Sequence, residues 1–118
     1  MNPSLWLPHT PALQIAELPD ILAQNPVVIL HFWAIWDLHD RTMDAYLQEV
    51  IPQFEKRIAF YSVNVDEESN HELCRQCHIL SIPALGCFVK GEWYEASVGV
   101  LNADKLILKL DSWLSVAE

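Results

Sequence analysis

The stretch VVILHFWAIWDLHDR, residues 27–41, decides the fold. Its first nine residues form a nearly continuous apolar run, which is typical of a strand buried on both faces of a sheet. The run then leads through Trp36 to two aspartates, Asp37 and Asp40, where a long amphipathic segment begins. A buried strand that passes directly into a helix indicates an α/β fold. The two carboxylates at this junction are the first candidates for a functional role.

The composition indicates a folded chain with a hydrophobic core. Of its 118 residues, 52% are apolar and 19% are charged, so the chain can bury a core without disulfides. We expect one domain over residues 1–118, with residues 1–11 as an irregular lead-in interrupted by proline. The formal net charge of −9 argues against nucleic acid and anionic membranes as partners.

Several features predict a cytoplasmic protein. No stretch reaches the ~20 consecutive apolar residues that a membrane-spanning helix needs. The N-terminus lacks the basic start and the apolar run of a secretory signal. Three cysteines, an odd number, fit a reducing compartment better than a disulfide framework.

The apolar pattern predicts helices that alternate with buried strands. The expected strands are residues 27–35, 58–65, 84–90 and 93–98, and the expected helices are residues 12–24, 37–56, 70–77 and 102–116. Pro19 interrupts the first helix and Pro52 weakens the end of the second, whereas Asn102 suits the N-cap of the last. This order predicts an α/β protein with a central mixed sheet of four to five strands and helices on both faces.

Four linked motifs in this order resemble the thioredoxin family. VVILHFWAIW, followed by four residues and Arg41, resembles the strand that leads into the family's Trp-Cys-Gly-Pro-Cys-Lys site. The other motifs are VNVDEESNHEL at residues 63–73, SIPALGCFVKGEW at residues 81–93 and SVGVLNADKLILKLDSWL at residues 97–114. The resemblance covers roughly residues 12–116 and implies a thioredoxin-like fold.

The chain departs from the family's pattern where the family carries its chemistry. In the family, two cysteines flank two residues at the start of the long helix. Asp37 and Asp40 stand at those positions here, around Leu38 and His39. The family's first thiolate attacks a disulfide and the second thiol resolves the intermediate, and a carboxylate can do neither. The resemblance therefore implies a thioredoxin-like protein with an atypical site that lacks the redox dithiol.

Two supporting positions of the family's site have also changed. The resemblance places His31 where the family buries a proton-accepting aspartate, and Ser62 where the family has a lysine. Because the nucleophile, the resolving thiol and the proton relay are lost together, we expect no catalytic residue at this site and no cofactor. A histidine within an apolar strand is most often a hydrogen-bonded core residue, and we expect this of His31.

The resemblance implies that a partner-binding surface is retained. Trp36 matches the tryptophan before the family's cysteines, Ile82-Pro83 matches a pair whose proline is cis, and Gly99 matches a glycine that a partner approaches closely. The backbone before a cis proline is free to pair with an extended peptide. The leading prediction is a non-catalytic module for a protein or extended-peptide partner, although the fold alone also explains Pro83 and Gly99. The expected binding residues are Trp36, Asp37, Leu38, His39, Ile82, Pro83 and Gly99.

Asp37 and Asp40 suit a structural role at the start of the long helix. Aspartate is among the best N-cap residues, and a carboxylate three positions later can reach back to the N–H of the cap residue. Both negative charges also lie at the positive end of the helix dipole. Three alternatives stay open: a metal site that includes His39, a catalytic carboxylate pair, and an acidic patch for docking.

The segment CRQCH, residues 74–78, carries a competing signal. Cys74 and Cys77 could form a relocated redox pair, which gives the alternative function of a thiol–disulfide oxidoreductase or redox sensor. With His78, the two cysteines also match the Cys-x-x-Cys-His motif that attaches c-type haem. In a regular helix His71, Cys74 and His78 would fall on one face, where they could be ligands for Zn or Cu. We expect neither haem nor a bound metal. The simplest interpretation is a core residue at Cys77 and a surface thiol at Cys74.

Overall fold

The computed structural model describes residues 6–118 of the chain, so residues 1–5 of the expected lead-in lie outside the described residues. The strands are β1 (Val27–Trp33), β2 (Ala59–Asn64), β3 (Ala84–Val89) and β4 (Glu92–Val98). The helices are α1 (Leu18–Gln24), α2 (Leu38–Val50), α3 (His71–Gln76) and α4 (Ala103–Ala117), with short 3-10 helices η2 (Ile15–Glu17), η3 (Ile51–Gln53) and η4 (Glu68–Asn70). None of the helices in the described range is long and apolar enough to cross a membrane.

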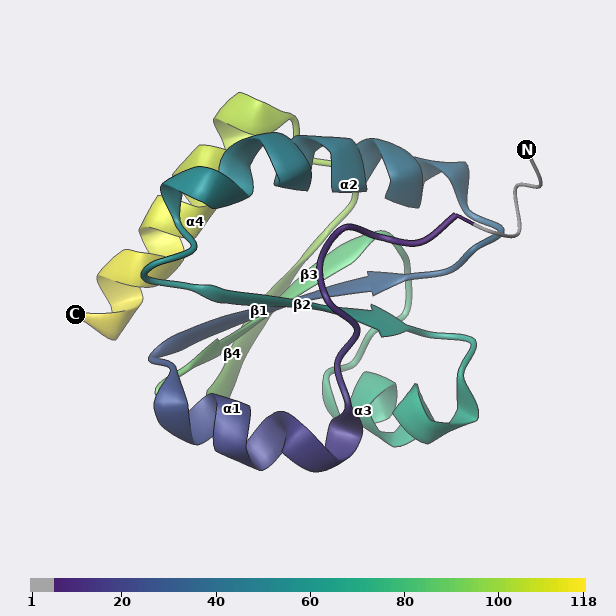
Figure 1. Cartoon of the computed structure of the whole chain (residues 1–118), viewed down its shortest axis with the longest axis horizontal. Helices are drawn as coiled ribbons and strands as arrows, with labels where there is room; N and C mark the ends of the chain where they lie inside the picture. The colour runs from purple at the N-terminus through teal and green to yellow at the C-terminus, as the bar shows by residue number, and fades with distance from the viewer. Residues whose placement is uncertain (1–5) are drawn as a thin grey trace.

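The four strands form one mixed sheet in the order β2-β1-β3-β4. The β1–β2 pair is parallel, and the other two pairs are antiparallel. Helices α2 and α4 lie on one face of the sheet, and α1 and α3 lie on the other (Figure 1). This architecture confirms the predicted α/β fold with helices on both faces.

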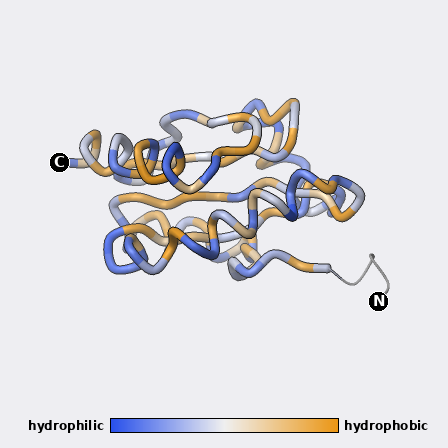
Figure 2. The backbone as a smooth tube through the Cα atoms, turned by 90° about the horizontal axis from the view of Figure 1, so that it is seen from above, coloured by the Kyte–Doolittle hydropathy of each residue, from blue (hydrophilic) through white to orange (hydrophobic). Residues whose placement is uncertain are grey.

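Strand β1 explains why residues 27–33 are apolar without alternation. All seven of its residues are buried, because helices cover both faces of the sheet. Val27 and Ile29 pack with α2 and α4, whereas Val28 and Leu30 pack with α1 and α3. In Figure 2 a largely hydrophobic strand runs between helices in which hydrophobic and hydrophilic residues alternate. Each helix therefore needs only one apolar stripe to complete a layer of the core.

The first helix is shorter than the expected range of residues 12–24. It begins only at Leu18, which places Pro19 in its first turn, where a missing N–H costs no hydrogen bond. Ala12 instead forms an isolated parallel bridge with Ser62 of β2. The expected helix over residues 12–24 is therefore wrong before Leu18, because Ala12 lies at the edge of the sheet and residues 15–17 form the 3-10 helix η2.

The second helix also ends earlier than expected. Helix α2 stops at Val50, and Pro52 stands in the first turn of η3 rather than in the last turn of a helix over residues 37–56. The predicted cap of the last helix is confirmed, since the Lys105 N–H donates to Asn102 Oδ1 at 3.0 Å. The strands agree with the predicted ranges to within one or two residues.

Residues 9–13, named the strap here, run beside the edge strand β2. The Ser62 N–H donates to the Pro11 carbonyl and the Leu13 N–H donates to the Ser62 carbonyl, both at 2.8 Å. These two bonds follow the pattern of a parallel ladder. The strap therefore forms a single isolated bridge at the edge of the four-stranded sheet, opposite Ser62.

Candidate functional site

Asp37 caps helix α2, as its sequence position predicts. Its backbone is extended, with φ −98° and ψ 110°, and its side chain accepts a hydrogen bond from the His39 N–H at 2.8 Å. This satisfies one of the free N–H groups of the first turn. Asp37 is half-buried, whereas Leu38 and His39 beside it are exposed. The start of α2 thus presents an apolar and an imidazole side chain to solvent.

Asp40 has a different role from the one expected. It is completely buried, and its Oδ2 accepts a hydrogen bond from the Ala34 N–H at 3.0 Å. Its Oδ1 lies 3.3 Å from His31 Nε2. The expected contact with the N–H of Asp37 is wrong, because that N–H donates to the Ala34 carbonyl instead. A buried Asp40 also cannot belong to an exposed acidic docking patch.

His31 is a buried partner of Asp40, which confirms that it is a hydrogen-bonded core residue. His31 Nε2 and Asp40 Oδ1 are within hydrogen-bond distance, so one proton is shared between the imidazole and the carboxyl group at this contact. His31 Nδ1 has no hydrogen-bond partner among the described residues. His31 also pairs with Ser62 across β1 and β2, so the two positions singled out in the sequence are neighbours in the sheet.

A groove of about 430 Å³, named the Trp36 groove here, opens between the start of α2 and the loop that follows α3. Its lining residues are Trp36, Asp37, Val65, Cys74, Ile79, Leu80, Ser81 and Ile82. Trp36 is 67% exposed and Leu80 is 94% exposed. The indole Nε1–H of Trp36 donates to Asp66 Oδ2 at 2.9 Å, which fixes the ring at the rim. An exposed, oriented tryptophan is a common anchor for a partner.

Of the expected binding residues, Trp36, Asp37 and Ile82 line the Trp36 groove. Pro83 is buried, and its carbonyl accepts a hydrogen bond from the Gly99 N–H at 2.8 Å. The Ile82–Pro83 peptide bond is cis. Gly99 has a φ of +97°, although an added Cβ would meet nothing within 4 Å. Backbone conformation, rather than lack of space, therefore explains this glycine.

The loop that forms one wall of the groove has free backbone groups. Within the part of the chain that the structure describes, neither Ser81 nor Ile82 takes part in a backbone hydrogen bond. Ser81 is exposed and Ile82 is half-buried. These amides and carbonyls are therefore available to an extended segment that lies in the groove.

The three cysteines are free thiols with little tendency to ionise. Burial raises the pKa of Cys77 to about 12, and the neighbouring Cys74 adds to this rise. Burial also raises the pKa of Cys74, which is half-buried and lines the Trp36 groove. Cys87 lies inside β3, and burial raises its pKa to about 12, with a further contribution from Glu95. A thiol must ionise to attack a disulfide, so this environment disfavours a reactive pair at Cys74 and Cys77.

The predicted alignment of His71, Cys74 and His78 on one helical face is wrong. Helix α3 ends at Gln76, and His78 has a left-handed φ of 53°. The Ile79 N–H closes the helix end by donating to the Cys74 carbonyl at 3.0 Å. The imidazole of His78 therefore leaves the helical face. Among residues 6–118, no group of three or more His, Cys, Asp or Glu side chains is arranged to hold a metal ion.

The raised thiol pKa values predict slow modification and a loss of stability in alkali. At pH 8 about one thiol in ten thousand is ionised when its pKa is about 12, so an alkylating reagent should label Cys77 and Cys87 only after unfolding. Because these folded-state values lie above the ordinary value of 9.0, their stabilising contribution is complete below about pH 9. It should be lost progressively as the pH rises toward 12. Mass spectrometry of labelled peptides and urea titrations from pH 7 to 11 measure both effects; rapid labelling of folded Cys77 would contradict the prediction.

A four-stranded mixed sheet between two pairs of helices, with a groove beside the start of α2, defines a thioredoxin-like class of protein. The chain belongs to the thioredoxin family, since the family model "Thioredoxin" matches residues 10–112.

Known thioredoxins resemble the chain in sequence and in structure. Chloroplastic thioredoxin M2 of Arabidopsis thaliana is 32% identical over 92 residues, which cover 78% of this chain and 48% of that protein. A thioredoxin of Rickettsia bellii is 28% identical over 88 residues, which cover 75% of this chain and 82% of the relative. The chain therefore spans about half of the chloroplastic relative but most of the bacterial one. A mutant thioredoxin from Halobacterium salinarum superimposes with a TM-score of 0.76 at 26% identity, covering 97% of this chain and 95% of that one.

Proposed function

We propose that this protein is a thioredoxin-family module that binds a partner without dithiol exchange at the start of α2. The observation that carries the proposal is the use of both Asp40 oxygens to hold the Ala34 N–H and His31. A carboxylate cannot attack or resolve a disulfide. Asp37 caps the helix, so both positions of the atypical Asp-Leu-His-Asp sequence have a structural role.

The proposed partner is a protein that presents an extended segment to the Trp36 groove. The exposed indole of Trp36 supplies an apolar anchor, and Leu80 adds a further exposed apolar surface in the lining. The free backbone groups of Ser81 and Ile82 suit strand addition by the partner. Leu38 and His39 extend this surface along the first turn of α2. Pro83 and Gly99 support it from behind, because the Gly99 N–H donates to the Pro83 carbonyl next to Ile82. A cytoplasmic location fits the three free thiols.

The second candidate function is thiol–disulfide exchange or redox sensing through Cys74 and Cys77. Two observations favour it: Cys74 lines the Trp36 groove, and the curated relatives are thioredoxins. The raised pKa values of both thiols weigh against it.

An insulin-reduction assay with dithiothreitol separates the two functions. We expect insulin to be reduced no faster with the wild-type protein or with Cys74→Ser than with dithiothreitol alone. The reason is that the groove-lining thiol of Cys74 has a raised pKa. Cys87→Ser serves as the matched control, since Cys87 is buried in β3. Turnover that disappears in Cys74→Ser but persists in Cys87→Ser would overturn the proposal and establish the redox alternative.

Selection from a displayed peptide library tests the binding function itself. We expect Trp36→Ala to raise the dissociation constant of the selected peptides about tenfold or more, because it removes the central apolar anchor. Leu108→Ala is the matched control, since Leu108 is an equally exposed apolar residue on α4, outside the Trp36 groove. Peptides that bind Trp36→Ala as tightly as the wild-type protein would place binding elsewhere.

A further inference from the structure

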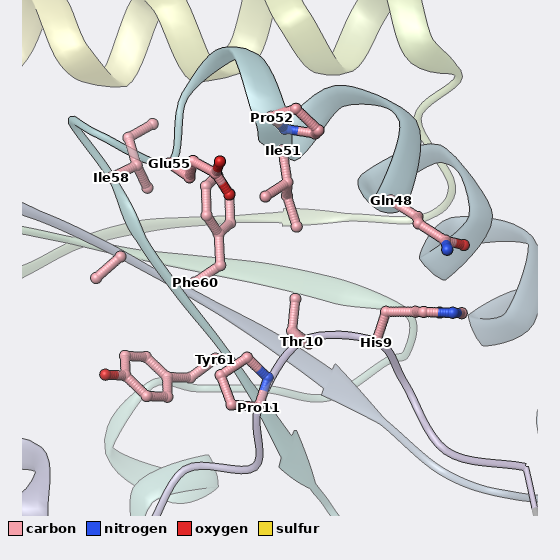
Figure 3. A pocket seen from close by; sticks show the side chains of 11 residues that line it. His9, Thr10, Pro11, Gln48, Ile51, Pro52, Glu55, Ile58, Phe60 and Tyr61 are labelled. Atoms are coloured by element: carbon pink, nitrogen blue, oxygen red, sulfur yellow. The ribbon is translucent and has the colours of Figure 1, made fainter.

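A second surface cavity lies apart from the Trp36 groove. It is a cavity of about 400 Å³, named the strap cavity here, between the strap, η3 and the first half of β2 (Figure 3). Its lining residues are His9, Thr10, Pro11, Gln48, Ile51, Pro52, Glu55, Ile58, Ala59, Phe60 and Tyr61. Figure 3 shows Ile51 directed from η3, and Phe60 directed from β2, toward the same space. The interior of the cavity is thus mainly apolar.

The backbone of Phe60 is unpaired on the side that faces this cavity. Both the N–H and the carbonyl of Ser62 bond outward to the strap. Because strand residues alternate, the N–H and the carbonyl of Phe60 point to the same outer side, two residues earlier. Within residues 6–118, no hydrogen bond from outside the sheet reaches either group. The edge of β2 is therefore covered at Ser62 and open at Phe60.

Pro11 explains why the strap does not close this edge. If the parallel ladder continued by one step, the N–H of residue 11 would donate to the Phe60 carbonyl. Pro11 has no N–H, so this bond cannot form. The open carbonyl of Phe60 is a direct consequence of the sequence of the strap.

A second contact ties the first residue of the strap, His9, to helix α2. The His9 N–H donates to Asp44 Oδ1 at 2.9 Å, and His9 Nδ1 lies 2.6 Å from Asp44 Oδ2. Asp44 is buried on α2, so the strap is attached to the helix just before it would reach the Phe60 edge. In Figure 3 the His9 side chain runs toward α2 and not along β2. The strap thus leaves space for another segment beside the strand.

We propose that the strap cavity binds an extended segment of a partner protein, which adds a strand to the edge of β2 at Phe60. The segment supplies an acceptor for the Phe60 N–H and a donor for the Phe60 carbonyl, and it inserts an apolar side chain between Ile51 and Phe60. Glu55 is exposed at the rim, and no lysine or arginine lines the cavity among the described residues. With a chain net charge of −9, this favours a segment with basic residues that alternate with apolar ones. A second copy of this chain fits poorly, because it carries the same acidic charge.

The test uses a blocked hexapeptide of alternating valine and lysine, with NMR detection on the full-length protein. Saturating peptide should shift the resonances of Ile51 and Phe60 and slow the hydrogen exchange of the Phe60 amide by about tenfold or more. The same peptide with every backbone amide N-methylated should bind about tenfold more weakly, since it cannot donate to the Phe60 carbonyl. Glu55→Lys should weaken binding, whereas Glu49→Lys, an exposed glutamate outside the cavity, should not.

The proposal would be overturned by the absence of saturable shifts, by equal binding of the N-methylated peptide, or by equal binding of a valine–glutamate peptide. Shifts confined to Trp36 and Ile82 would also overturn it, because the peptide would then occupy the Trp36 groove. This site does not depend on the proposed function of that groove, so the failure of either leaves the other standing.

Discussion

We expect Asp40→Ala to lower the free energy of unfolding by about 2–4 kcal/mol. The substitution removes the acceptor of the Ala34 N–H and the hydrogen-bond partner that the His31 imidazole has among the described residues. Both groups are buried away from bulk solvent, so each loses a hydrogen bond that the surface would otherwise replace. Urea titration at pH 7, followed by circular dichroism, measures the loss.

Two substitutions serve as controls for Asp40→Ala. Asp40→Asn keeps one carbonyl acceptor and should lose clearly less stability. Asp37→Ala removes only the cap of α2, which is worth about 0.5–2 kcal/mol. If Asp40→Ala lowers the free energy of unfolding no more than Asp37→Ala does, the contacts of Asp40 with Ala34 and His31 do not stabilise the end of β1.

The largest loss of stability is expected for Trp113→Ala, at about 3–5 kcal/mol. Trp113 is completely buried in the core layer between the sheet and helices α2 and α4. The substitution leaves a cavity and removes the hydrogen bond from Trp113 Nε1 to Glu95 Oε1, which measures 2.7 Å. Thermal and urea unfolding at pH 7 determine the change.

Trp36→Ala is the natural comparison for Trp113→Ala. Its side chain is 67% exposed at the rim of the groove, so its removal should change stability by only about 0.5 kcal/mol. Equal losses for the two tryptophans would show that Trp36 belongs to the core rather than to a binding surface. The pair therefore separates the structural tryptophan from the one assigned to function.

The order of helices and strands could be predicted because apolar periodicity records burial directly. The unbroken apolar run of β1 requires cover on both faces, and that requirement alone implies the layered architecture. The helix boundaries near Pro19 and Pro52 were less accurate. Proline is accepted in a first turn and disfavoured later, and only the three-dimensional start of each helix decides which case applies.

The candidate site was only partly predictable. The cap at Asp37 is a local feature, and the sequence identified it. The burial of Asp40 against His31 joins residues nine positions apart, and it depends on how β1 meets α2. The contact between Trp36 and Asp66 spans thirty positions, so no local pattern could indicate it. Leu80 lines the groove but was not among the expected binding residues. Its one signal in the sequence is that it is a leucine outside every predicted helix and strand.

The buried pair of His31 and Asp40 has a consequence for how this sequence can change over time. Each residue stabilises the other inside the protein, since removing either one takes away a hydrogen bond that the other makes in a buried position. Substitutions at the two positions are therefore coupled, and descendants of this chain should exchange them together or keep both. A cysteine substituted at position 40 alone would replace the carboxylate that His31 contacts. Any change at position 40 is thus constrained by the residue at position 31.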